Sequence, residues 1–544
     1  MPRRLLGGKM EHNILVNEIG YQTGDVKKAV YRGEKKDSFS LIDVTTRKSV
    51  YEGKILDGEG IKNPSAGETN YGIDFSDFNV EGKYYLQIGE EKSVSFEIKK
   101  DIYKELVVSL LRFFYLQRCG IELPEKLAGK FAHPSCHDTK ARIYGTDEFI
   151  DVNGGWHDAG DYGRYITPAA VTIQALLYAI EEDPKILDLN LNIPESGQAL
   201  PDVLAEIKYE LDWMLKMQRA DGQVYHKVTC AGFCDFFMPE FETEELIVCP
   251  PSVTATANFA SSLSKAYTVY KKYDEAYANT LAEAAKKAYG AIRTIDPYVD
   301  FKNPEGIVTG EYGDPYIEDE SYWASAEMYK TFGDEQYKED FEKYVNKEVW
   351  HGYGWEDVGS FGNLAYLLTD ESKIDSTLLD KIKKAMVEKA DKLLAIAQKD
   401  GYGISFLPED YIWGSNMYVL ENGSHLFDAY KITGDKKYLD AAREHINYCL
   451  GKNPMDVCYV TGFGENSVYN PHHRPSAAAG EAMEGMLSGG PNYQLLDPTA
   501  KKKCEGMPAA KCFADELLSY STNEVTIYWN SAMLMLIGQV YGNI

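Results

Sequence analysis

Three segments of this 544-residue chain gather side chains that can move protons or hold ions. They are GGWHDAGDYGRY (154–165) with His157, Asp158 and Asp161, NPHHRPS (470–476) with His472, His473 and Arg474, and YSTNEVTIYWNSA (520–532) with Glu524. Two aspartates three residues apart in a glycine-rich loop can act on a water molecule. A distant glutamate can serve as the acid partner in the same reaction.

Each signal is weak by itself. The aspartate pair also suits a solvated turn, the His-His-Arg triplet can bind a metal or an anion, and an acidic side chain in a first helical turn is favoured by the helix dipole. Together the segments supply a base, an acid and hydrogen-bond donors, which is the equipment for splitting a glycosidic bond with two carboxylates.

The elements that must position these groups fall into two patterns. Up to about residue 98, FSLIDV (39–44), KYYLQIG (83–89) and SVSFEIKK (93–100) indicate strands separated by turn clusters, which predicts a small β-sandwich. From Tyr103 onward the apolar residues recur at helical spacing. About twelve paired helices follow, a number that favours a closed helical toroid over a bundle.

The remaining composition narrows the function classes. A formal net charge of −27 repels phosphate backbones, so we expect no nucleic-acid partner. No segment is apolar for long enough to span a bilayer, so we expect no membrane association. Nine cysteines in so long a chain argue against a disulfide scaffold. The first residues lack the apolar run of a secretory signal, which leaves the compartment open, with export after signal removal slightly favoured.

The order of the motifs resembles glycoside hydrolase family 9, the inverting β-glucanases, in the subgroup with an N-terminal immunoglobulin-like domain. The motifs that carry the resemblance are ILVNEIGYQ (14–22), GGWHDAGDYGRY, GQVYHKVT (222–229), SVTATANFA (252–260), YIWGSN (411–416), YCLGKNP (448–454), YVTGFG (459–464), NPHHRPS and NEVTIYWN (523–530). The resemblance implies a mainly α fold: an immunoglobulin-like β-sandwich over residues 11–98, then an (α/α)6-barrel catalytic domain over residues 101–544.

The resemblance also implies roles for individual residues. Asp161 is expected to be the general base, Asp158 to help hold the attacking water, and Glu524 to be the general acid. If Glu524 lies in a first helical turn, as the pattern predicts, the dipole opposes the protonated state that an acid needs, and burial and nearby carboxylates must outweigh it.

Substrate-binding residues follow from the same comparison. His472 and Arg474 resemble the side chains that hydrogen-bond the sugar beside the cleaved bond. Aromatic and imidazole rings that are expected to line the cleft are Tyr225, His226, Trp413 and Tyr528. For each of these four rings, packing in the core is nearly as good an explanation.

Two metal sites are also implied. Cys119, Cys136, His137 and His157 match a structural zinc site of the subgroup, and two thiolates with two imidazoles form a tetrahedral zinc set. Asp319, Glu320 and Asp357 match positions that bind calcium in relatives, and oxygen ligands suit that ion. An exposed acidic turn explains the second group as well.

The leading hypothesis is therefore an endo-β-1,4-glucanase, monomeric, that acts on β-1,4-glucan or cello-oligosaccharides. The nearest alternative is an exo-acting member such as a cellodextrinase, a β-glucosidase or an exo-β-glucosaminidase, because loops that block one end of the cleft decide this point. A non-catalytic carbohydrate-binding protein and a zinc hydrolase are alternatives from other classes. The carboxylates argue against the first, and four protein ligands on the metal argue against the second.

Overall fold

The computed structural model describes residues 12–542 except 57, 296 and 297. The predicted start of the first domain, residue 11, and the predicted end of the second, residue 544, lie outside this range. The chain forms two compact units: unit 1 comprises Met1–Ser109, Ala390–His472 and Ala482–Glu524, and unit 2 comprises Leu110–Lys389, His473–Glu481 and Val525–Ile544. This division does not follow the predicted domain boundary near residue 100, which stays a prediction.

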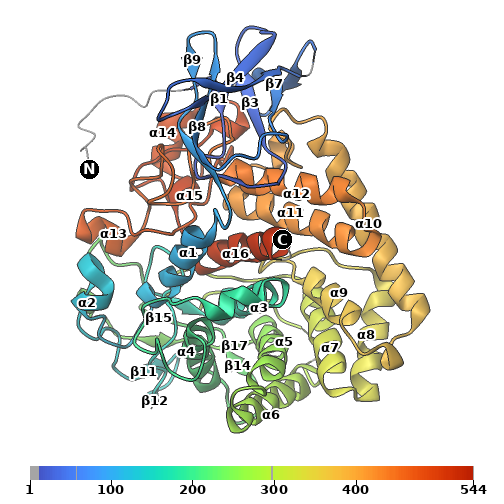
Figure 1. Ribbon diagram of the computed structural model, residues 1–544. Helices are drawn as coiled ribbons and strands as arrows, with labels where there is room; N and C mark the ends of the chain where they lie inside the picture. Colours follow the sequence, from blue (N-terminus) through green and yellow to red (C-terminus); the bar gives the residue numbers. More distant parts are fainter. Residues whose placement is uncertain (1–11, 57, 296–297, 543–544) are drawn as a thin grey trace. The chain divides into compact units, whose positions relative to one another are not determined.

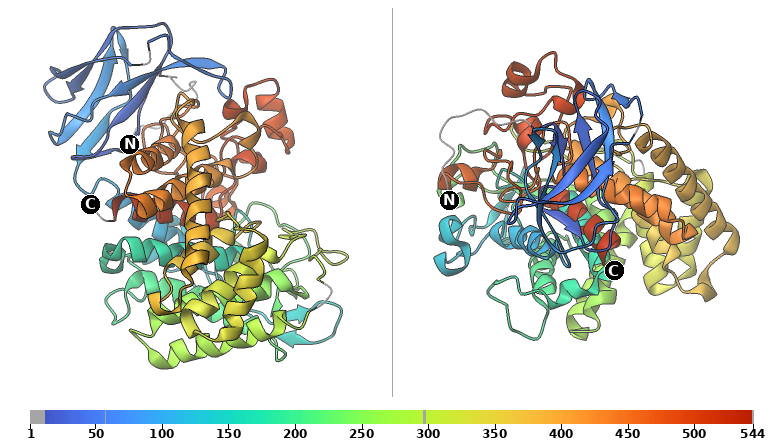
Figure 2. Two further views of the ribbon diagram at one scale, coloured as in Figure 1. Left: turned by 90° about the vertical axis from the view of Figure 1, so that its right-hand side faces the viewer. Right: turned by 45° about the horizontal axis from the view of Figure 1, so that its top comes forward.

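Unit 1 begins with the predicted β-sandwich, drawn in blue in Figure 1 and seen from two further directions in Figure 2. Its strands are β1 (Ile14–Leu15), β2 (Gly20–Gln22), β3 (Lys28–Arg32), β4 (Ser38–Asp43), β5 (Ser49–Lys54), β6 (Ile61–Asn63), β7 (Glu68–Asp74), β8 (Gly82–Ile88), β9 (Glu91–Lys92) and β10 (Phe96–Lys99). One sheet has the order β1-β3-β7-β6 and the other β2-β10-β8-β4-β5, with β9 paired to β8.

Alternation of side chains explains why these strands pack as two layers. In β8 every second residue from Tyr84 to Ile88 is buried, and in β10 Phe96 and Ile98 are buried while their neighbours are partly exposed. Leu86 and Ile98 from one sheet and Tyr31 and Ile73 from the other belong to a single apolar cluster. The period of two therefore places one face of each sheet in a shared core.

The helices follow the predicted helical pattern closely. Unit 1 contains α11 (Ser415–Thr433), α12 (Lys436–Cys449), α14 (Pro498–Cys504) and α15 (Tyr520–Asn523). Unit 2 contains α2 (Glu125–Ala128), α3 (Ile166–Glu182), α4 (Asp202–Lys216), α5 (Val253–Tyr270), α6 (Glu275–Ile292), α7 (Glu318–Phe332), α8 (Glu335–Lys347), α9 (Gly359–Leu367), α13 (Arg474–Ala479) and α16 (Ile527–Tyr541). The division between the units falls within α1 (Lys104–Leu116) and α10 (Ser376–Ala397).

Helices of unit 2 occupy inner and outer positions. The inner helices α16, α3, α5, α7 and α9 pack against one another in that order, and α6 and α8 pack outside α5 and α7. Residues 166–180 of α3 are all buried, whereas α8 buries only Tyr337, Phe341 and Val345. A helix that is buried on every side needs neighbours all round, and a helix with one apolar stripe needs only one, which produces the two layers.

Short strands complete unit 2. They are β11 (Ala141–Ile143), β12 (Phe149–Ile150), β13 (Arg164–Tyr165), β14 (Val224–Tyr225), β15 (Lys227–Thr229), β16 (Ile247–Val248) and β17 (Pro251–Ser252). They form a sheet of order β12-β11-β16-β15-β13 and a separate pair, β14-β17. Within the described part of the chain, no helix is both long and apolar enough to cross a membrane. None of the nine cysteines forms a disulfide in this structure.

Asn17, in the ILVNEIGYQ motif, links the sandwich to α12 inside unit 1. Its side chain is fully buried and donates to the Tyr103 hydroxyl and to the Asn447 side chain, both at 2.9 Å. Its Oδ1 accepts from the backbone N–H groups of Ile19 and Gly20 at 3.1 and 3.2 Å. One amide thus satisfies four buried polar groups.

We expect Asn17→Ala to lower the free energy of unfolding by about 1–3 kcal/mol, because it leaves buried donors and acceptors without partners. Thermal and urea denaturation followed by circular dichroism would measure the loss. Asn13→Ala is the matched control, since Asn13 is exposed and its side chain reaches only Glu91 at the surface. Equal stability of the two variants would contradict this role of Asn17.

Candidate active site and metal clusters

The loop 154–165 is held in place by hydrogen bonds to Gln117, the residue that directly follows α1. Its Nε2 donates to the carbonyl oxygens of His157 and Ala159, each at 3.1 Å, and its backbone oxygen accepts from the N–H of His157 at 2.7 Å. Its Oε1 lies 3.0 Å from Nε2 of His473. The loop therefore has a fixed backbone at the residues that surround Asp158.

Glycine is required at position 155 because the loop packs closely against Trp213 of α4. Gly155 has φ +80°, and a Cβ atom there would lie 2.7 Å from the side chain of Trp213. The next residue, Trp156, is buried, and its indole N–H donates to Glu206 at 2.8 Å. The small residues of the motif thus let the loop lie close against α4.

Asp158 and Asp161 are both buried, with a small set of donors around each carboxylate. The Tyr312 hydroxyl donates to Asp158 Oδ2 at 2.5 Å, and Asp158 Oδ1 has no partner among the described residues. Asp161 Oδ2 accepts from the Gly163 N–H at 3.0 Å and from the Tyr165 hydroxyl at 3.1 Å. One carboxylate oxygen of Asp158 is therefore left for another ligand such as a water molecule.

The pKa values of both aspartates are raised. Burial raises the pKa of Asp158 well above its ordinary value, the charge of Asp161 raises it further, and the Tyr312 hydroxyl lowers it. Burial also raises the pKa of Asp161, while the charge of Arg474 and the hydrogen bonds from Gly163 and Tyr165 oppose that rise. Both carboxylates hold protons more readily than exposed aspartates, which suits groups that exchange protons with water.

Arg474 joins this group in unit 2. Its Nη1 donates to the Gly160 carbonyl at 2.8 Å, and its Nε donates to the Cys234 carbonyl at 2.9 Å. The guanidinium carbon lies 5.6 and 5.3 Å from the ring centres of Phe233 and Phe236. The structure thus brings the predicted arginine to the same loop as the two aspartates.

His472 and Glu524 come together in unit 1. They pair as an isolated parallel bridge, in which the His472 N–H donates to the Asn523 carbonyl at 2.8 Å. Glu524 is not in a first helical turn, contrary to the sequence prediction. It follows the short helix α15, and the cap of α16 is Thr526, whose side chain accepts from the Trp529 N–H. The expected opposition from the α16 dipole was based on the wrong helix start.

The predicted aromatic residues differ in their surroundings. Trp413 is 38% exposed and its ring centre lies 5.5 Å from that of Tyr520, which in turn lies 5.9 Å from His472. In unit 2, Tyr528 is largely buried and packs edge-on against Tyr312. Tyr225 is partly exposed, with Arg219 over its ring. Trp413 is therefore the most exposed of the four predicted rings, and Tyr225 is partly exposed.

His226 corrects one prediction. Its side chain is fully buried and stacks on Phe301, with ring centres 3.7 Å apart. Its Nε2 donates to the Glu311 carbonyl at 2.8 Å, and its Nδ1 accepts from the Ser252 hydroxyl at 2.7 Å. Both nitrogens are used inside the protein, so His226 supports the loop that carries Tyr312 and does not contact a sugar.

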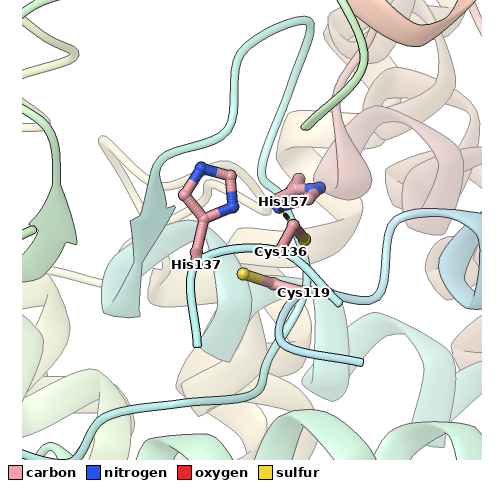
Figure 3. Close-up of side chains that lie close together, drawn as sticks. All are labelled: Cys119, Cys136, His137 and His157. Atoms are coloured by element: carbon pink, nitrogen blue, oxygen red, sulfur yellow. Dashed lines mark hydrogen bonds between the residues drawn. The ribbon is translucent and has the colours of Figure 1, made fainter. Parts of the chain in front are cut away.

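The four predicted zinc ligands form one buried cluster, shown in Figure 3. One ligand atom from each of Cys119, Cys136, His137 and His157 lies within 4.8 Å of the other three. Cys136 Sγ and His157 Nε2 are 3.9 Å apart, and Nδ1 of His137 is buried without a partner among the described residues. Two thiols and two imidazoles at this spacing fit a tetrahedral zinc ion.

A second cluster is acidic. Asp314, Asp319 and Glu320 are buried and offer carboxylate oxygens within 4.8 Å of one another. Burial, then the charge of Asp357, raises the pKa of Asp319 to about 7. Both oxygens of Glu320 are buried without a partner among the described residues. Asp357 is thus an electrostatic neighbour, and the group of close carboxylates contains Asp314, which the sequence prediction did not include.

Comparisons with known proteins identify the family. The model of glycosyl hydrolase family 9 matches residues 103–537, and that of the cellulase N-terminal Ig-like domain matches residues 9–93. The chain belongs to glycosyl hydrolase family 9. This family 9 hydrolase is 38% identical to a cellodextrinase of Butyrivibrio fibrisolvens, over 97% of this chain and 99% of that protein.

Two solved structures extend the comparison. A single mutant of a thermostable endoglucanase from Alicyclobacillus acidocaldarius superposes with a TM-score of 0.92 at 34% identity, covering 97% of this chain and 99% of that one. A Zn-binding triple mutant of the family 9 endoglucanase J30 superposes with a TM-score of 0.90 at 30% identity, covering 96% and 99%. The predicted fold, an immunoglobulin-like β-sandwich followed by an (α/α)6 barrel, is confirmed.

Sequence reasoning on this family 9 hydrolase missed several residues that the structure places at these sites. Tyr312 and Asp314 lie in a loop without a recognisable motif, so sequence gave no signal for them. Tyr165 is inside the quoted motif, yet only its contact with Asp161 distinguishes it from a core tyrosine. Glu242, whose Oε2 lies 2.9 Å from Nε2 of His137, was not among the predicted site residues.

Tyr312→Phe should shift the acidic limb of the pH–activity profile of this hydrolase to higher pH. The hydroxyl stabilises the charged form of Asp158, so its loss raises the pKa of that carboxyl, and a higher pH is then needed to ionise it. The kcat/KM for a soluble glucan, measured from pH 4 to 8, tests the shift. Tyr273→Phe, at an exposed turn, is the control. An acidic limb that stays in place in Tyr312→Phe would refute the coupling.

Proposed function

We propose that this protein is an endo-β-1,4-glucanase that cleaves internal bonds of β-1,4-glucan with inversion at the anomeric carbon. Family membership makes it a glycoside hydrolase. The observation that carries the proposal is the buried pair Asp158 and Asp161 with its tyrosine donors, in the loop that resembles the family's base motif. The similar Alicyclobacillus endoglucanase supports the endo mode.

In the proposed mechanism Asp161 takes a proton from water as that water attacks the anomeric carbon. Asp161 must be ionised for this step, and the charge of Arg474 with the donors Gly163 and Tyr165 favours the ionised form. Asp158 holds the same water through the carboxylate oxygen that Tyr312 does not use. Glu524 gives a proton to the leaving oxygen. Inverting enzymes keep acid and base about 6.5–9.5 Å apart so that a water molecule fits beneath the sugar.

Five of the residues predicted from the sequence are proposed to bind the sugar. We propose that His472 and Trp413 contact the sugar. The backbone of His472 pairs with that of Glu524, and the ring of Tyr520 packs against both His472 and the partly exposed Trp413. Arg474, Tyr225 and Tyr528 are also proposed to contact substrate. A pyranose ring stacks well on an aromatic face because the apolar C–H groups of the sugar pack against the π face of the aromatic ring.

We further propose a structural zinc ion at Cys119, Cys136, His137 and His157. All four ligands come from the protein, so the ion is closed to water and serves to hold the loop, in which His157 directly precedes Asp158. For the acidic cluster we propose calcium at Asp314, Asp319 and Glu320, with Asp357 nearby. A divalent cation would stabilise the charged forms of carboxylates whose pKa values burial raises.

The product profile tests the endo assignment. We expect carboxymethyl-cellulose to lose viscosity rapidly while few reducing ends appear, and cello-oligosaccharides to give several products, because internal bonds are cut. The 38% identity to a cellodextrinase makes exo-action the specific alternative. A single small product from the chain end, without viscosity loss, would show exo-action, and no product at all would support a binding protein.

Glu524→Gln should reduce kcat on unactivated glucan by at least ~100-fold, because the leaving oxygen loses its proton donor. Hydrolysis of cello-oligosaccharides measures this loss, and circular dichroism checks the fold. Glu516→Gln is a matched control in the same segment, since Glu516 pairs with Lys503 at the surface. Near-normal turnover of Glu524→Gln would remove Glu524 from the mechanism.

A further inference from the structure

The imidazole of His137 has two different nitrogen environments. Its Nε2 lies 2.9 Å from Glu242 Oε2, and its Nδ1 is buried and has no partner among the described residues. In Figure 3 one ring nitrogen of His137 is turned toward the thiol of Cys119 and the other points away from the cluster. Because Nε2 is used by Glu242, Nδ1 is the nitrogen that remains for a metal ion.

Glu242 is itself held for this contact. It follows the 3-10 turn Pro239–Phe241 in the loop between β15 and β16, and its side chain is only 7% exposed. The thiol of Cys234 lies within hydrogen-bonding reach of the same carboxylate. A buried carboxylate needs partners that offset its desolvation, and His137 with Cys234 provides them.

The arrangement matches a general property of metal-bound histidines. Such a histidine donates its free N–H to a carboxylate or a carbonyl, which fixes the tautomer, orients the ring and makes the coordinating nitrogen more basic. In this structure the buried Nδ1 faces the thiol of Cys119, which is itself one of the four candidate ligands. The ring therefore presents one nitrogen to the cluster and the other to Glu242, as a metal-bound histidine does.

We propose that Glu242 is a positioning residue of the metal cluster: its carboxylate accepts the Nε2–H of His137 and so presents Nδ1 to the zinc ion. This inference rests on the zinc site proposed above and names a residue outside the four ligands. It gives Glu242 a role that the sequence alone did not suggest.

The test compares Glu242→Gln with Glu244→Gln in the full-length protein. Both changes remove one negative charge from the same segment, but Glu244 is exposed. Zinc content is measured first, and zinc affinity is then measured by competition with a chromogenic chelator. We expect Glu242→Gln to bind zinc about 10–100-fold more weakly than the wild type, and Glu244→Gln to bind as the wild type does.

Thermal denaturation of the zinc-loaded and metal-free proteins separates positioning from simple structural support. Glu242→Gln should lower the Tm of the zinc-loaded protein and leave that of the metal-free protein unchanged. An equal loss in both forms, or unchanged zinc affinity, would overturn the role of Glu242 alone. If the metal-free protein does not stay folded, the rate of zinc release from loaded protein to excess chelator replaces this comparison, and equal rates overturn the proposal. A wild type that takes up no zinc would overturn the zinc site itself.

Discussion

Asp158 and Asp161, three residues apart, are both buried, and the cost of burying two carboxylates constrains the rest of the loop 154–165. Moving a charged carboxylate out of water costs several kcal/mol unless hydrogen bonds and opposite charges offset the cost, and two like charges close together add to it. In this chain the offset comes from Tyr312 on Asp158, and from Tyr165, the Gly163 N–H and Arg474 on Asp161. These groups act on the aspartates only if the loop holds its observed shape. The pKa values of Asp158 and Asp161 therefore depend on the geometry of the loop.

This dependence explains why several buried residues around the loop 154–165 form hydrogen bonds to loop backbone and keep it in place. Gln117 uses both ends of its amide on the loop and on His473, and Gly155 allows the loop to approach Trp213. His226 is fully buried, and its Nε2 donates to the carbonyl of Glu311, the residue that directly precedes Tyr312. A residue that looks catalytic by type can therefore act by fixing the position of another residue's hydroxyl.

The sequence was sufficient for the fold because the fold rests on local patterns. Alternating residues such as Tyr84, Leu86 and Ile88 specify a two-faced strand, and apolar residues at helical spacing from Tyr103 onward specify the helices. The start of the last helix was misplaced because Thr522, Asn523 and Thr526 are all good cap residues by type, and only the hydrogen bond to Trp529 selects Thr526.

The site was less accessible to sequence, for a physical reason. Motifs record residues that are close along the chain, whereas Tyr312 meets Asp158 and Glu242 meets His137 across more than a hundred residues. The role of a histidine also cannot be read from residue type: His226 and His157 are both buried, yet the first supports a loop and the second is a ligand candidate. Contacts of this kind appear only once the fold has brought the segments together.

The cluster of candidate zinc ligands shows how distant segments can be tied to the loop 154–165. The proposed zinc ion would join the segment just after α1 at Cys119, the segment of Cys136 and His137, and the loop itself at His157. Metal binding adds its free energy to the folded state alone when the unfolded chain lacks the site, so one ion restricts all three segments at once.

Glu242 extends this restriction to a fourth segment, because it lies in the same loop whose Cys234 carbonyl holds Arg474. The loop is also fastened to the motif by the Tyr162 hydroxyl, which donates to the Phe237 carbonyl at 2.6 Å. The loop 154–165 and Arg474, whose charge opposes the rise in the pKa of Asp161, would thus depend on the same proposed ion, one through His157 and the other through His137 and Glu242. A metal that touches no substrate could in this way set the electrostatic environment of the proposed base.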